Sequence, residues 1–111
     1  MKYLSEKQKF VYTGLLAICT VLSVALFHNN NLLNISVLIL CSILMVKVDG
    51  DKNVVRLFVA GFILGPLSEA ICIYFGAWQY ADTLVLGFPV YLPFVWGNAA
   101  LLFKRLTFYT E

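Results

Sequence analysis

Charged side chains are scarce in this sequence of 111 residues: only 13% are Asp, Glu, Lys or Arg, whereas 61% are hydrophobic. Soluble domains carry about 25% charged and about 45–50% apolar residues. A chain this short buries only a modest share of its surface when it folds, so it cannot hide so much apolar area from water. The composition therefore excludes a soluble globular monomer and predicts a protein whose solvent is lipid.

Motifs for metals, nucleotides and nucleic acids are also missing. Cys19, Cys41 and Cys72 lie far apart inside apolar runs, without the CxxC spacing of zinc and redox sites. The sequence contains no Gly-rich phosphate loop, no HExxH and no GxSxG. A net charge of only +2, dispersed along the chain, excludes a nucleic-acid binder. We therefore expect no metal, no cofactor and no nucleic-acid partner.

What the sequence does contain is four long apolar runs, at about residues 10–27, 32–48, 54–76 and 84–103. Each run approaches the length of about 20 residues that spans a bilayer as a helix. The first run is long for a cleaved signal peptide and no small-x-small cleavage site follows it, so we expect it to be retained. The runs take nearly the whole chain, which predicts one all-α integral membrane domain of four transmembrane helices over residues 1–111.

The basic residues predict the orientation of these helices. All eight fall on one side of the expected topology, before the first run, around the second connection or after the fourth run: Lys2, Lys7, Lys9, Lys47, Lys52, Arg56, Lys104 and Arg105. The first and third connections contain neither Lys nor Arg. Because Lys and Arg accumulate on the cytoplasmic side, both termini are predicted to be cytoplasmic in a multi-pass protein of the cell membrane.

Small and faintly polar residues form a stripe on the third apolar run. At 100° per residue they cover an arc of about 100°; they are Gly61, Gly65, Ser68, Glu69, Cys72 and Gly76. Gly61-x-x-x-Gly65 allows another helix to approach closely. We expect Gly61, Gly65 and Gly76 to serve helix packing, either within the chain or in contact with a second copy or a partner membrane subunit.

Glu69 is the one acid inside an apolar run. Seven residues separate it from Gly76, which places it roughly 10 Å below the outer end of the helix. Acids at such depth usually face the protein interior or a cavity. Glu69 is therefore the candidate catalytic residue, and a structural hydrogen bond or a position near the interface is the alternative.

The fourth apolar run adds candidates for a pocket beside Glu69. Pro89 and Pro93 stand four residues apart on one face with Trp96, and each proline invites a kink that frees backbone carbonyls. Tyr91 and Asn98 share the other face, with Tyr91 at a depth that suits a hydroxyl partner for Glu69. Together with Ser68 of the third run, we expect Pro89, Tyr91 and Asn98 to line this pocket.

Residues 69–96 resemble the membrane-embedded carotenoid-modifying proteins of the lycopene-cyclase and carotenoid-hydratase types. The likeness lies in an acid within one span, then Phe75-Gly76-Ala77-Trp78-x-Tyr80, then Gly87-x-Pro89, then an aromatic-rich span. The paired acids that follow this proline in the cyclases are absent here. The resemblance implies a hydrophobic, isoprenoid-like ligand, and it implies pocket roles for Glu69, Trp78, Tyr80 and Pro89.

Three functions stay open at this point. The chain is an accessory or structural membrane subunit, or it binds or converts an isoprenoid-like molecule in the lipid phase with Glu69 as general acid. The alternative is a proton-coupled transporter of a hydrophobic or cationic solute, in which Glu69 exchanges the proton. Whether the protein is an enzyme is left undecided by the sequence, and we expect a homo-oligomer or a complex with a partner membrane subunit.

The predicted orientation can be checked by cysteine labelling in intact cells. In a Cys-free background, Asn30→Cys and Thr83→Cys should react with a membrane-impermeant thiol reagent added outside, because both lie in connections without basic residues. Asp51→Cys and Thr110→Cys should react only after the cells are lysed. Labelling of either of these two in intact cells would contradict the orientation.

Overall fold

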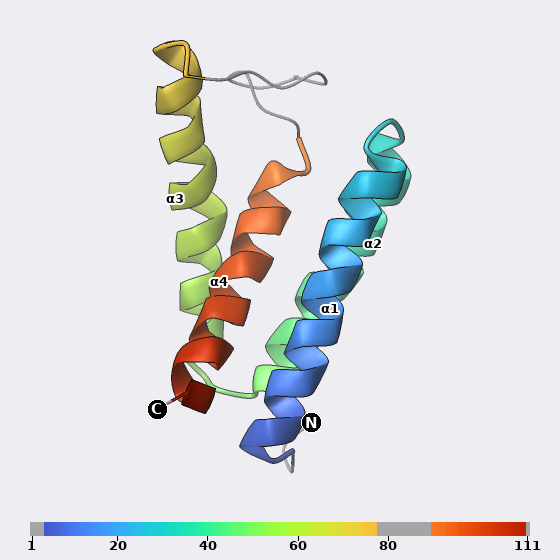
Figure 1. Cartoon of the computed structure of the whole chain (residues 1–111), viewed down its shortest axis with the longest axis vertical. Helices are drawn as coiled ribbons and strands as arrows, with labels where there is room; N and C mark the ends of the chain where they lie inside the picture. Colours follow the sequence, from blue (N-terminus) through green and yellow to red (C-terminus); the bar gives the residue numbers. More distant parts are fainter. Residues whose placement is uncertain (1–3, 78–89, 111) are drawn as a thin grey trace.

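Four helices make up the computed structural model, which describes residues 4–77 and 90–110 (Figure 1). They are α1 (Glu6–Phe27), α2 (Asn31–Asp49), α3 (Val54–Tyr74) and α4 (Leu92–Thr110). The all-α class and the four helices agree with the prediction from the sequence. Three of them, α1, α2 and α3, are long and apolar enough to cross a membrane, and their bounds lie close to the first three expected runs.

Short capped connections fix the antiparallel order of the helices. Ser5 forms a capping box with Gln8 at the start of α1, so two backbone N–H groups without helical partners are satisfied there. The Asn30 side chain accepts from the backbone N–H of Leu33 at the start of α2. Gly50 ends α2 with φ of 73°, a left-handed conformation that glycine adopts without a Cβ clash. Both termini and the α2–α3 connection therefore lie at one end of the bundle, here called the termini end (Figure 1).

The fourth helix differs from its expected range. It begins at Leu92 and continues through Lys104 to Thr110, whereas the apolar run suggested residues 84–103. Pro93 is the second residue of α4 and lies in its first turn, where a missing N–H costs no helical hydrogen bond. Pro93 therefore starts the helix and does not kink it in the middle. Pro89 lies outside the described residues.

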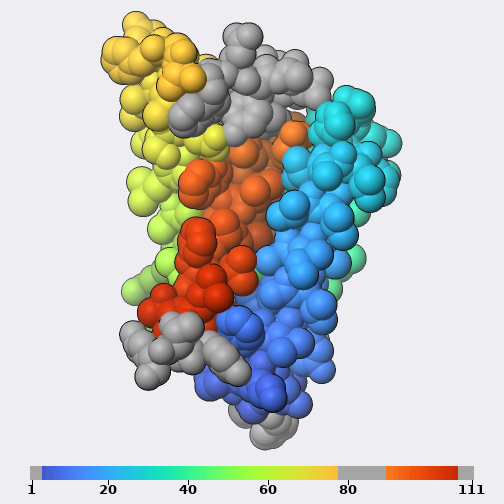
Figure 2. Space-filling view, viewed as in Figure 1, coloured from blue at the N-terminus to red at the C-terminus, as the bar shows by residue number. Residues whose placement is uncertain are grey.

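α4 is the central helix of the bundle. It packs against α3 on one side and against α1 and α2 on the other, while α2 and α3 barely touch. The space-filling view shows α4, in orange and red, between α3 and α1 (Figure 2). Each of the other helices therefore depends on a different part of the α4 surface for its position.

The side of α4 that faces α1 and α2 combines apolar and polar side chains, because Leu101 packs with Met45 and Val54 while Asn98 and Arg105 are buried beside it. The buried residues of α1 are Thr13, Thr20 and Ser23, whereas Leu26 of the same helix is 70% exposed. Such a distribution is the reverse of that in a soluble helix bundle, where the apolar stripe faces the core. It suits a helix surrounded by lipid, in which small polar side chains join helices through hydrogen bonds.

Asn98 is the centre of this polar interface. Its amide Nδ2 donates to Oγ1 of Thr20 on α1 at 3.0 Å, and its Oδ1 accepts from Oγ of Ser42 on α2 at 2.7 Å. Nearer the opposite end of the bundle, Oγ of Ser23 donates to Oδ1 of Asn34 at 2.7 Å. Asn98 and Asn34 are both almost fully buried, so these hydrogen bonds satisfy groups that water cannot reach, whereas Nδ2 of Asn34 has no hydrogen-bond partner among the described residues.

The polar side chains recur every seven residues. Seven residues are nearly two helical turns, so members of such a series share one helix face. The series are Glu6, Thr13 and Thr20 on α1, and Asn98 and Arg105 on α4, with Tyr91 seven residues before Asn98 in the turn that precedes α4. The two series face each other along the bundle, because Thr20 binds Asn98 and Glu6 binds Arg105.

Ion pairs close the interface at the termini end. Asp49, which is 1% exposed, lies 2.6 Å from Nζ of Lys104 and 3.1 Å from Nε of Arg105. Arg105 also donates from Nη1 to Oε2 of Glu6 at 2.7 Å. The pKa of the nearby Asp51 carboxyl lies below its usual value. The larger cause is the hydrogen bond that the backbone N–H of Asn53 donates to it, and the next is the Lys104 ammonium group beside it. Because these ion pairs neutralise Lys104 and Arg105, α4 continues past both residues to Thr110.

Replacement of Asn98 by alanine tests the polar interface. Asn98→Ala should lower the free energy of unfolding by about 1–2 kcal/mol, because it removes two interhelical hydrogen bonds at a buried position. Asn29→Ala, the same truncation in the exposed α1–α2 connection, should leave stability unchanged. The check is unfolding of the purified protein by titrated detergent, and equal stability of the two variants would contradict the role of Asn98.

Candidate functional site

Glu69 lies on the opposite side of α4 from the polar interface. It is half-buried on α3, and its Oε2 accepts a hydrogen bond from Nε1 of Trp96 on α4. An indole N–H only donates, so Glu69 is the acceptor in this contact. The contact fixes the indole ring against α3, in the half of the helix pair that lies away from the termini end.

Gly61 and Gly65 of α3 lie against Trp96 of α4. A Cβ on Gly65 would lie 2.2 Å from the Trp96 ring, and a Cβ on Gly61 would lie 2.8 Å from the Trp96 carbonyl oxygen. Gly97 of α4 is equally close to the Phe58 ring of α3, at 2.4 Å from its Cβ position. Glycine therefore permits the close approach of α3 and α4 from both helices, and this contact lies within one chain.

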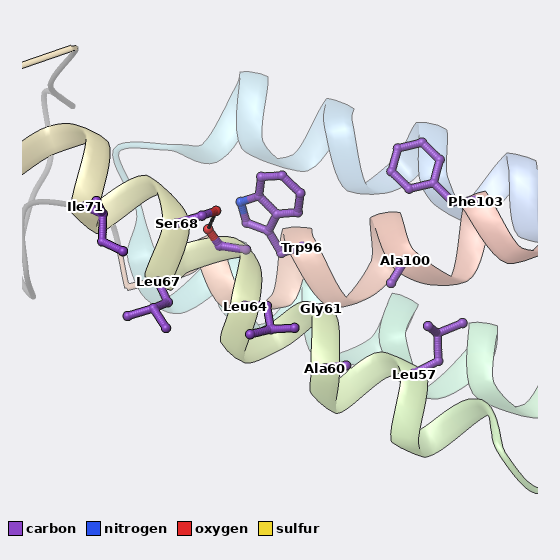
Figure 3. Close-up of a pocket in the computed structure, with 11 residues that line it drawn as sticks. Leu57, Ala60, Gly61, Leu64, Leu67, Ser68, Ile71, Trp96, Ala100 and Phe103 are labelled. Carbon is purple, nitrogen blue, oxygen red and sulfur yellow. Dashed lines mark hydrogen bonds between the residues drawn. The ribbon is translucent and has the colours of Figure 1, made fainter.

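Beside Trp96, a groove of about 580 Å³ runs between α3 and α4 (Figure 3). On α3 its walls extend from Leu57 to Ile71, and on α4 they extend from Trp96 to Phe103. The indole of Trp96 reaches from α4 toward α3 and forms part of the wall. The lining is almost entirely apolar. Ser68 is the one hydroxyl residue in it, and its Oγ donates to the Gly65 carbonyl of its own helix at 2.8 Å.

The residues expected to share one pocket are distributed over two sides of α4. Ser68 lines the groove and Glu69 contacts its wall through Trp96. Asn98 points the other way, to Thr20 and Ser42, and Tyr91 is buried seven residues before it on the same helix face. Trp78, Tyr80 and Pro89 lie outside the described residues.

Gly76, expected to serve helix packing, follows the end of α3. Its φ is 82°, and a Cβ there would meet no atom of the described residues within 4 Å. The structure therefore gives Gly76 a role in the turn after α3, where a left-handed conformation favours glycine. Gly61 and Gly65 alone of the three contact another helix among the described residues.

Two features of the site were not identified from the sequence. The first is the pairing of Glu69 with Trp96, because residues 27 positions apart on different helices show no common pattern. The second is the polar interface around Asn98, for which the seven-residue spacing on the first and fourth runs was an available signal. Thr and Ser give only a weak polar signal within an apolar run because their side chains are small.

The chemistry available at the groove is that of an apolar surface. Within residues 4–77 and 90–110, no three His, Cys, Asp or Glu side chains come together as metal ligands. Trp96 and the aliphatic side chains offer apolar contact area, and Nε1 of the Trp96 indole donates a hydrogen bond to the Glu69 carboxyl group. The arrangement is suited to binding an apolar molecule. No family model, curated protein or solved structure matches the chain.

The close contact of α3 and α4 can be tested with a pair of glycine variants. Gly65→Ala should lower the melting temperature, because its Cβ would overlap the Trp96 ring and overpacking costs about 1–3 kcal/mol. Gly14→Ala on α1 places the same methyl group where nothing lies within 4 Å, so it should leave stability equal or raise it. If Gly65→Ala melts as the wild type does, α3 and α4 do not approach this closely.

Proposed function

We propose that this chain is a multi-pass protein of the cell membrane that binds an extended apolar, isoprenoid-like molecule in the groove between α3 and α4. Three helices that are long and apolar enough to span a bilayer support the membrane location. The polar interior and apolar exterior of α1 support it independently. On this proposal α4, enclosed by the other three helices, completes a four-helix membrane domain.

The distribution of basic residues supports a cytoplasmic termini end. The described basic residues belong to the ends of the helices at this end of the bundle and to the α2–α3 connection. The connection between α1 and α2, at the opposite end, has neither Lys nor Arg. Since Lys and Arg accumulate on the cytoplasmic side, the termini end faces the cytoplasm in this proposal.

The dimensions of the groove are the observation that carries the binding proposal. Its α3 wall extends from Leu57 to Ile71, and the 14 steps between these residues cover about 21 Å at 1.5 Å per residue. Dividing the volume of about 580 Å³ by this length gives a mean cross-section of about 28 Å². A single extended hydrocarbon chain fits a cross-section of this size.

The length of the groove suits one long hydrocarbon chain, because its wall is about 21 Å long. An extended isoprenoid-like chain such as geranylgeraniol can lie along it. The resemblance of residues 69–96 to carotenoid-modifying proteins is the reason for choosing an isoprenoid-like ligand in this proposal.

In this proposal Glu69 positions Trp96, which forms part of the wall of the groove. Its hydrogen bond to Nε1 fixes the orientation of the Trp96 indole, which offers a large flat apolar surface to a ligand chain. Catalysis by Glu69 stays a prediction, as do proton-coupled transport and association with a partner subunit or a second copy. None of these is needed for the binding proposed here.

Filling the groove should abolish binding without unfolding the protein. Ala60 is exposed and lines the groove, so Ala60→Phe places a ring inside it. Ala25→Phe makes the same change on the exposed side of α1, away from the groove. With the full chain in phosphatidylcholine nanodiscs and radiolabelled geranylgeraniol as the probe, Ala60→Phe should weaken binding at least about fivefold, and Ala25→Phe should not.

Two results would overturn the proposal. One is the absence of saturable binding of geranylgeraniol to the wild type. The other is equal binding to Ala60→Phe and Ala25→Phe, which would place the ligand elsewhere on the protein. Melting curves of both variants confirm that a loss of binding is not a loss of fold.

A further inference from the structure

Polar and apolar side chains alternate along the buried face of α2. Asn34, Ser42 and Asp49 are buried there, and Leu38 and Met45, which are both 0% exposed, lie between them. Each of these residues is three or four positions from the next, so they follow one another on one helix face. The interface of α1, α2 and α4 therefore contains separate polar levels with apolar side chains between them.

The middle level consists of Thr20, Ser42 and Asn98, and the protein itself satisfies it. Asn98 donates to Thr20 and accepts from Ser42. Oγ1 of Thr20 in turn donates to the carbonyl oxygen of Leu16, four residues before it, at 3.0 Å. Each of the three polar side chains at this level thus has a hydrogen-bond partner within the bundle.

Toward each end of the bundle from this level lies a buried polar atom that the protein does not satisfy. Among the described residues, Oγ1 of Thr13 and Nδ2 of Asn34 have no hydrogen-bond partner, although the two residues are 1% and 0% exposed. An unsatisfied buried polar atom is destabilising, and proteins commonly satisfy such atoms with buried water. Hydrocarbon chains of lipid offer no hydrogen bond, so water is the ligand that suits both atoms.

Thr13 lies close to a polar hollow at the termini end. The hollow has a volume of about 360 Å³, and its lining includes Glu6, Lys9, Asp49 and Arg105. Lys9 lies four residues before Thr13 on the same helix, so one turn, or about 6 Å, separates the hollow from the Thr13 hydroxyl. The Lys9 carbonyl oxygen is the second polar partner that a water bound to Thr13 needs.

Asn34 lies equally close to the opposite end of the bundle. It is three residues after Asn31, where α2 begins, so about 5 Å of helix separates it from the exposed α1–α2 connection. Its Oδ1 already accepts from Oγ of Ser23. That hydroxyl oxygen can itself accept a hydrogen bond, so a water bound to Nδ2 of Asn34 has a second partner beside it.

We infer that water is bound in this interface at two positions, at Oγ1 of Thr13 from the termini end and at Nδ2 of Asn34 from the opposite end, and that the middle level between them is dry. The two sites lie on the other side of α4 from the groove, so the inference does not depend on the proposed ligand. Leu38 and Met45 separate the sites from the middle level. The interface is hydrated from both ends, and no continuous file of water crosses it.

Water-edited solid-state NMR of the full chain in phosphatidylcholine nanodiscs tests both sites in one sample. The side-chain amide of Asn34 is compared with that of Asn98, and Cβ of Thr13 is compared with Cβ of Thr20. Each site thus has a buried control of its own residue type. Polarisation from water should build up severalfold faster at Asn34 and Thr13, because a bound water lies within hydrogen-bond distance of them. The variants Asn34→Leu, Asn98→Ala, Thr13→Val and Thr20→Val identify the four signals by their loss.

Thr13→Val adds a measurement of stability, because it replaces the hydroxyl with a methyl group of similar size. If water binds the hydroxyl, the variant loses that hydrogen bond, and the equilibrium constant for unfolding in titrated detergent should rise about fivefold. A hydroxyl that binds nothing would make the valine variant the more stable one. Thr107→Val makes the same change at an exposed position on α4 and should leave the constant unchanged.

The results that would overturn the inference differ for its parts. The absence of a water signal at both Asn34 and Thr13 would overturn the binding of water in this interface, and a signal at only one of them would overturn the other site. A signal at Asn98 or Thr20 as strong as that at Asn34 would overturn the dry middle level. Higher stability of Thr13→Val than of the wild type would overturn the site at Thr13.

Discussion

Hydrogen bonding by a single buried amide links three of the four helices, and the rest of the bundle is arranged around it. Asn98 donates to Thr20 of α1 and accepts from Ser42 of α2, so its own helix must lie between them. A buried amide without partners is costly, which makes this position far more restrictive than an apolar one. Because the α4 face with Asn98 packs against α1 and α2, the face with Trp96 and Gly97 packs against α3. The groove between α3 and α4 is a consequence of that division.

The two faces of α4 are held by different physical means. Toward α1 and α2, directional hydrogen bonds and ion pairs fix both depth and rotation, from Asn98 down to Arg105. Toward α3, steric fit decides the distance, because Gly61 and Gly65 admit Trp96 while Gly97 admits Phe58. The Glu69–Trp96 hydrogen bond adds direction at one point of this second interface. The groove runs along the same helix pair, and its lining includes Gly61, Gly65 and Trp96 beside larger side chains of α3.

Much of the fold can be predicted from the sequence, because the length of an apolar run between polar connections indicates the length of the helix. The first three runs predicted α1, α2 and α3 closely. The fourth run was misleading, since Lys104 and Arg105 suggested an end, yet Asp49 and Glu6 neutralise them and the helix continues. Pairing between distant helices has no local signal, so the contact of Glu69 with Trp96 was not predicted. The spacing of Gly61 and Gly65 predicted a close helix contact, but no sequence pattern states whether the second helix belongs to the same chain.

The polar face of α4 also has a consequence for how the chain is assembled. In lipid, α1 and α2 can enter first as a hairpin, because both are strongly apolar and already share the Ser23–Asn34 hydrogen bond. α4 carries Asn98, Lys104 and Arg105, and it is the one described helix whose composition is not apolar enough for a membrane span by itself. Its partners in α1 and α2 are synthesised before it. If the chain lies in a membrane as proposed, the helix that organises the finished bundle is the one least suited to enter lipid by itself, and its polar partners on α1 and α2 precede it in the chain.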